Sequence, residues 1–62
     1  MKELRDNIKS VLATVTLINA PTVFDYIQSE QGYKTIEETM IRMMVDENLS
    51  ASGCIPHIEA QL

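Results

Sequence analysis

The stretch 32–49 constrains the fold most, because local signals fix both ends of one helix there. Thr35 and Glu38 have the spacing of a capping box, in which a hydroxyl and a carboxylate each accept a backbone N–H at the helix start. Asn48 can take the left-handed conformation that ends many helices. We therefore predict a helix over 36–47.

The residues around this helix extend the prediction. Gly32 is expected to end the preceding helix, because glycine adopts the left-handed C-terminal conformation without strain. Leu49 is expected to fold back on the last helical turn. Four apolar side chains recur at helical spacing and should face a core: Ile36, Met40, Met43 and Met44.

The N-terminal part of the chain predicts a second helix over 3–18. Its apolar residues follow alternating spacings of four and three, the pattern of a coiled-coil seam: Leu4, Ile8, Val11, Val15 and Ile18. Pro21 suits a first helical turn and opens a helix over about 21–30, with Thr22 and Asp25 as a weaker capping pair.

A short last helix is expected over about 53–61. Ser50 or Ser52 supplies its cap, and Pro56 is tolerated when it falls within the first turn. The chain thus predicts an all-α fold, a small bundle of three helices plus a short C-terminal fourth, in a single domain spanning 1–62.

The length of the chain favours association. A domain of 62 residues buries only about 60% of the surface that its unfolded chain exposes. One cysteine cannot form an intrachain disulfide, so a partner chain is the expected stabiliser. We predict a homo-oligomer, most simply a C2 dimer, with the seam in its interface: Leu4, Ile8, Val11 and Val15.

Composition limits the classes of function. The net charge of −4 argues against a general nucleic-acid binder, which needs clustered cations. It suits a basic protein surface, or simply solubility. No apolar run reaches the length of a membrane span, no signal-peptide core is recognisable, and an unpaired cysteine fits a reducing compartment. These features predict a cytoplasmic protein.

No set of residues indicates catalysis or a cofactor. Cys54 and His57 share a helix face at a spacing of three, but two ligands are too few for zinc, and no third group supports a nucleophile. Glu37 and Glu38 are neighbours that point about 100° apart and cannot form an acid–base pair. We expect no enzyme, no metal and no cofactor.

The leading functional hypothesis is a non-catalytic binding protein. Its size and charge match phage- or plasmid-type regulators or inhibitors that occupy a basic surface on a host protein. The candidate contacts lie on the predicted helix 36–47: Glu37, Arg42, Asp46 and Glu47.

Two alternatives stay open. An oligomer could sequester a nucleotide-type signal without catalysis, because Tyr33, Lys34 and Thr35 would place an aromatic ring and a cation beside free N–H groups at a helix start. The chain could also be a structural oligomerisation module.

The pattern of a capped helix, an Asp-Glu-Asn turn and a shorter helix over 35–62 resembles the C-terminal part of the late-transcription coactivators of T4-type phages. Those proteins bind host RNA polymerase. The resemblance covers less than half of the chain, carries no functional residue across, and implies only a small phage-encoded regulator.

Overall fold

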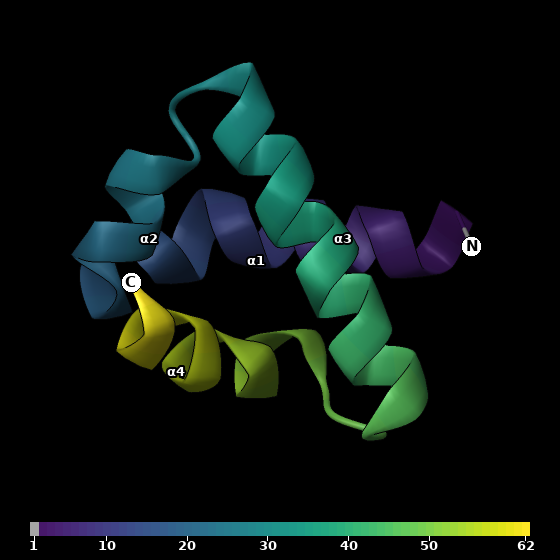
Figure 1. Ribbon diagram of the computed structural model, residues 1–62. Coiled ribbons are helices and arrows are strands. Elements are labelled where there is room, and N and C mark those ends of the chain that lie inside the picture. The colour runs from purple at the N-terminus through teal and green to yellow at the C-terminus, as the bar shows by residue number, and fades with distance from the viewer. Residues whose placement is uncertain (1) are drawn as a thin grey trace.

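The computed structural model describes residues 2–62 and confirms the all-α fold. Its four helices are α1 (Lys2–Asn19), α2 (Pro21–Tyr26), α3 (Glu30–Asp46) and α4 (Ala51–Gln61). Figure 1 shows α3 crossing α1, with α2 and α4 beside them and the two chain ends on opposite sides. Within 2–62 no strand occurs. We predicted that the last helix would be the short one, but the shortest helix is α2, with six residues.

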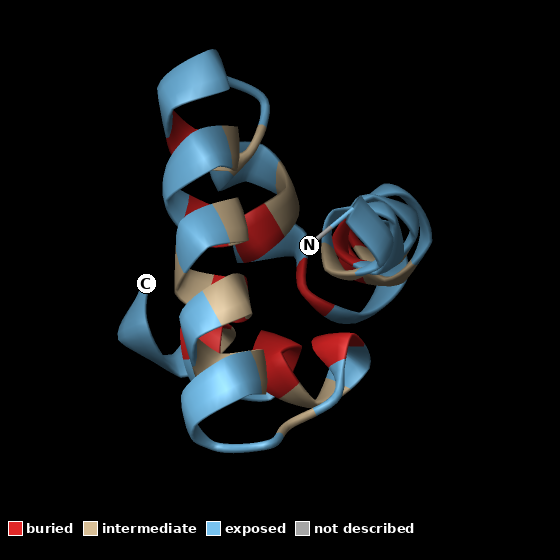
Figure 2. Ribbon diagram, turned by 90° about the vertical axis from the view of Figure 1, so that its right-hand side faces the viewer, coloured by how far each residue is buried: buried red, intermediate tan, exposed pale blue. Residues whose placement is uncertain are grey.

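The core closes within one chain. Buried positions lie on the helix sides that face one another (Figure 2), and α1 and α4 each contact all three other helices. All four helices, with the α2 cap, supply the core: Ile8, Leu12, Ala20, Val23, Ile36, Met40, Ala51, Cys54, Ile55 and Ile58. The accessible surface of 4163 Å² is close to the ~4,000 Å² expected of a folded monomer of this mass.

The start of α3 differs from the prediction. Ser29 is the cap, and its hydroxyl accepts the N–H of Gly32 at 3.0 Å. Thr35 lies in the second turn, where its hydroxyl donates to the carbonyl of Gln31 at 2.9 Å. The predicted capping box is therefore wrong: Thr35 uses its hydroxyl on the preceding turn, as threonines inside helices do.

Gly32 does not end a helix but lies inside the first turn of α3. A Cβ atom at this position would run into the backbone carbonyl of Tyr26. Glycine is needed here for a close approach between α3 and the end of α2, and not for a left-handed conformation. Because Ser29 is extended to cap α3, α2 also ends earlier than predicted.

The start of α2 is capped from a distance. Pro21 takes the predicted position in the first turn, but neither Ala20 at the cap nor Thr22 caps with a side chain. The Glu59 carboxylate of α4 instead accepts the N–H of Val23 at 3.3 Å. A negative charge is favourable at a helix N-terminus, so Glu59 links α4 to α2.

The predictions for the turn before α4 are confirmed in part. Asn48 has a positive φ of 55°, and Leu49 packs against the core. Ser50 is the cap, with its hydroxyl accepting the N–H of Gly53 at 3.1 Å. Because α4 starts two residues earlier than predicted, Pro56 lies beyond the first turn, and its missing N–H leaves the Ser52 carbonyl without a helical donor.

Candidate binding surfaces

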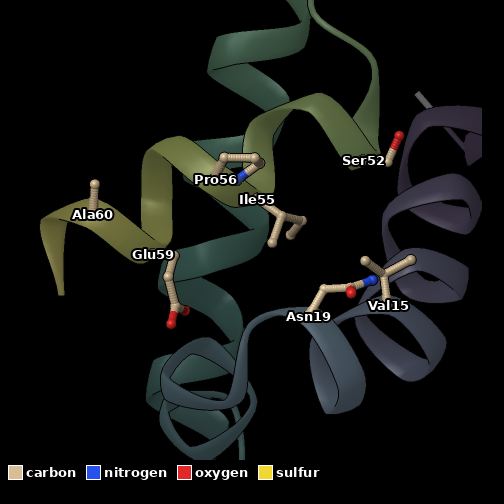
Figure 3. Close-up of a pocket in the computed structure, with 7 residues that line it drawn as sticks. All are labelled: Val15, Asn19, Ser52, Ile55, Pro56, Glu59 and Ala60. Carbon is tan, nitrogen blue, oxygen red and sulfur yellow. The ribbon is translucent and has the colours of Figure 1, made fainter.

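A groove runs between the end of α1 and the outer side of α4 (Figure 3). Its volume is about 590 Å³, within the range of ligand and peptide sites. Seven residues line it, and most of their surface there is apolar: Val15, Asn19, Ser52, Ile55, Pro56, Glu59 and Ala60.

The polar groups of the groove are few. Ile55 forms part of the buried core and projects toward α1, whereas Glu59 points toward α2 (Figure 3). Since Glu59 accepts the N–H of Val23, the one ionised side chain of the lining already has a partner. The groove therefore offers an apolar wall with Asn19 and Ser52 as its other polar residues.

The rim of this groove continues along α1. Ile18 is 79% exposed, and Leu4, Val11 and Val15 are half-buried. We call the following residues the apolar face: Leu4, Val11, Val15, Ile18, Pro56 and Ala60. Ile8, which was predicted to share an oligomer interface, is instead fully buried in the chain's own core. The core side of α1 is centred on Ile8, Leu12 and Thr16, so the predicted seam lies only partly at the surface.

The outward side of α3 is different in chemistry. Glu38, Arg42 and Asp46 follow one another at intervals of one helical turn, and all are exposed. Val45 lies among them and is 61% exposed. We call Glu38, Arg42, Val45 and Asp46 the charged face.

The predicted partner contacts do not form one patch. Glu37 turns toward α1, where its carboxylate pairs with Arg5 at 3.1 Å and its side chain is only 13% exposed. Glu47 follows the last turn of α3 and helps to raise the pKa of Cys54 in α4. Arg42 and Asp46 remain together on the charged face, and Glu38, which we had assigned to a cap, joins them.

Of the predicted nucleotide contacts, Tyr33 lies at the end of the first turn of α3, and Lys34 and Thr35 lie in its second turn. The Tyr33 N–H already donates to the Ser29 carbonyl at 2.9 Å, so a free helix start next to Tyr33, Lys34 and Thr35 does not exist. Burial, together with the Glu37 charge, raises the pKa of Tyr33. The Tyr33 hydroxyl is buried without a hydrogen-bond partner.

A second groove of about 310 Å³ lies on the other flank of α1. Tyr33 lines it, together with Lys9, Gln28 and four apolar residues, Leu12, Ala13, Phe24 and Ile27. The Tyr33 hydroxyl is closed off from solvent, so the polar side chains that this groove offers are Lys9 and Gln28.

Cys54 and His57 have different surroundings. Cys54 is buried, and its thiol donates to the carbonyl of Ser50 at 3.3 Å. Burial is the main cause that raises the pKa of this thiol. His57 is exposed. Across residues 2–62, no three His, Cys, Asp or Glu side chains gather in a way that could hold a metal ion.

Comparisons with known proteins gave no relative. No family model, no curated protein and no solved structure matches the chain. The resemblance to phage coactivators therefore gains no support, and it began with a helix cap at Thr35 that the structure does not have. In the described part of the chain, no helix is both long and apolar enough to cross a membrane.

Proposed function

We propose that this protein is a small, non-catalytic binding protein that contacts a basic surface of another protein through its charged face. In this proposal it acts as a phage- or plasmid-type regulator or inhibitor of a host protein in the cytoplasm. The observation that carries the proposal is a row of exposed, unpaired charges around the exposed Val45.

The charges of this row are free to pair with a partner. The one ion pair found among residues 2–62 joins Arg5 to Glu37, so Glu38, Arg42 and Asp46 form no ion pair with one another or with any other residue in that range. A small apolar centre with a charged rim is the usual anatomy of a transient protein interface. Val45 supplies the centre here.

The charge of the chain selects the partner. With a net charge of −4, the protein attracts basic surfaces over distances of about a Debye length and repels acidic ones. Charged groups at the rim of an interface act mainly on the association rate and on its salt dependence. We therefore expect binding that weakens as the salt concentration rises.

The sequestration of a nucleotide is not proposed further. Its basis was a free helix start beside Tyr33 and Lys34, and that start lies at Ser29, one turn earlier. The role of a structural oligomerisation module concerns the apolar face and does not compete with binding through the charged face.

The test uses affinity capture from bacterial lysate with quantitative mass spectrometry. The wild-type chain is compared with Glu38→Lys/Asp46→Lys on the charged face. The matched control is Asp6→Lys/Asp25→Lys, which changes the net charge equally at exposed positions outside this face. We expect one or few partners with basic surfaces to be lost with the first variant and kept with the control. Partners that both variants retain, or an absence of specific partners, would contradict the proposal.

A further inference from the structure

We infer that the apolar face binds a second copy of this chain, in a C2 dimer whose two α1 helices pack antiparallel with Val11 at the two-fold axis. This inference is independent of the proposed function, because it concerns a different surface. The arguments are the spacing of the apolar residues, the absence of charge between them, their exposure and the area that they offer.

The spacing along α1 is self-complementary. Leu4, Val11 and Ile18 are each seven residues apart, which is close to two helical turns, so they form one line of about 21 Å along the helix. When two such lines meet antiparallel about Val11, each Leu4 lies opposite the Ile18 of the other copy. An isologous interface requires this kind of match between one patch and itself.

The line carries no charged residue. Asn7 and Ile8 fall between its first two members, and Thr14 and Val15 between its last two. Contact along this line therefore buries no charged side chain of the line itself, and burying an unpaired charge is the largest cost of removing polar surface from water. The net charge of −4 still opposes association over longer distances, but charged residues do not meet across the line.

The line is most exposed at its end: Leu4 and Val11 are half-buried and Val11 packs against the core, whereas Ile18 is open to solvent. Ile18 is the most exposed of the large apolar side chains, at 79%. It lies one turn after Val15, which lines the groove between α1 and α4. In the antiparallel arrangement, the first turns of the partner's α1 lie over this groove and cover Pro56 and Ala60.

The available area sets the strength of the dimer. A specific interface needs about 500 Å² from each copy, which is about one eighth of the accessible surface of 4163 Å² of this chain, and the apolar face is small on that scale. We therefore expect a dissociation constant in the micromolar range. Because the core closes within one chain, the separated protomer should stay folded.

Sedimentation equilibrium from low micromolar to millimolar protein tests the dimer. We expect a reversible change from 7.0 kDa to twice that mass. Ile18→Glu should raise the dissociation constant at least roughly thirtyfold, the effect of losing a hot spot. Leu17→Glu is the matched control, since Leu17 is 58% exposed but points about 100° away around α1. Circular dichroism checks that both variants remain helical.

Disulfide trapping tests the orientation. Val11→Cys should crosslink with itself, and a mixture of Leu4→Cys and Ile18→Cys should form the mixed dimer, whereas Leu4→Cys alone should not crosslink. Wild-type protein, whose Cys54 is buried, is the control. A single 7.0 kDa species at all concentrations, equal effects of Ile18→Glu and Leu17→Glu, or self-crosslinking of Leu4→Cys would each overturn the inference.

Discussion

The apolar face and the charged face come from two helices of nearly equal length, 18 residues in α1 and 17 in α3. Both helices bury one side in the same core. They differ in what remains outside: α1 keeps a second line of apolar residues, ending in Ile18, whereas α3 exposes Glu38, Arg42 and Asp46 with only Val45 among them.

On this difference we base the proposal that one small chain has two distinct binding surfaces. Apolar area drives association without direction, and its effect grows with the area removed from water. Exposed charges add little to affinity but guide encounter and choose the partner. We therefore propose that α1 and α4 serve self-association and that α3 serves the recognition of another protein.

The largest expected effect is the loss of stability when a buried side chain of α1 or α3 is truncated, compared with an exposed side chain of the same helix. Ile8→Ala and Met40→Ala each remove a fully buried side chain, and each should lower the free energy of unfolding by about 2–5 kcal/mol. Ile18→Ala and Val45→Ala should change the stability of the protomer by less than about 0.5 kcal/mol. Urea unfolding at protein concentrations below dimerisation measures all four. A large loss for Val45→Ala would show that the charged face is part of the core.

A smaller effect concerns the close approach that orients α3, and with it the charged face. Gly32→Ala places a methyl group against the Tyr26 carbonyl and should cost about 2 kcal/mol or more. Gly53 occupies the equivalent position of α4, behind the same kind of serine cap, and a Cβ there meets only the Ser50 hydroxyl at 3.0 Å. Gly53→Ala should be near neutral, because the cost of displacing the Ser50 hydroxyl is offset by the better helix propensity of alanine, which is worth about 1 kcal/mol. Thermal melts that rank the two variants equally would contradict this difference.

The next effect is the loss of stability when Glu59, the groove residue of α4 that caps the start of α2, is truncated. Glu59→Ala removes the carboxylate that accepts the Val23 N–H and should lower the free energy of unfolding by about 1 kcal/mol. Glu38→Ala on the charged face is the control and should lie within about 0.5 kcal/mol of the wild type. Hydrogen exchange should also accelerate at Val23 in the first variant only. Unchanged exchange there would exclude a capping role for Glu59.

The smallest effect is a loss of stability in alkali. Burial raises the pKa of Cys54 and of Tyr33 in the folded chain, so the unfolded chain releases these protons first. Stability is then complete below the ordinary thiol pKa of 9.0 and decreases as the pH rises through and beyond it. Tyr33→Phe should weaken this decrease and cost nothing at pH 7, because the buried hydroxyl has no partner. Denaturant titrations between pH 7 and pH 11 measure both results; an unchanged alkaline slope would refute the assignment to Tyr33.

The sequence predicted the fold class and most of the helices because these depend on local periodicity and turn chemistry. Asn48 and Pro21 took their expected positions for that reason. The predicted start of α3 was wrong because both Ser29 and Thr35 are residues that can cap a helix, so the sequence carries two competing cap signals. In the structure Ser29 is the cap, with its hydroxyl accepting the Gly32 N–H, and Gly32 lies close against the Tyr26 carbonyl.

The candidate surfaces were predictable only in part. Helical spacing placed Leu4, Val11 and Val15 on one side of α1, but it could not show that the core would take Ile8. Sequence proximity grouped Glu37 and Glu47 with Arg42, although Glu37 pairs with Arg5 of α1 and Glu47 lies beyond the last residue of α3. Which side of a helix meets the core depends on the other helices, and this information lies outside any single periodic segment.

The central claim, that the two faces serve different contacts, is tested most directly by amide ¹H–¹⁵N spectra recorded over a dilution series. The account predicts that peaks from the apolar face, including Val11, Val15, Ile18 and Ala60, shift with protein concentration. The peaks of Glu38, Arg42 and Asp46, and those of the other residues on the outward side of α3, should not shift with protein concentration. Concentration-dependent shifts on the charged face, or an apolar face that stays unchanged up to millimolar protein, would contradict the account.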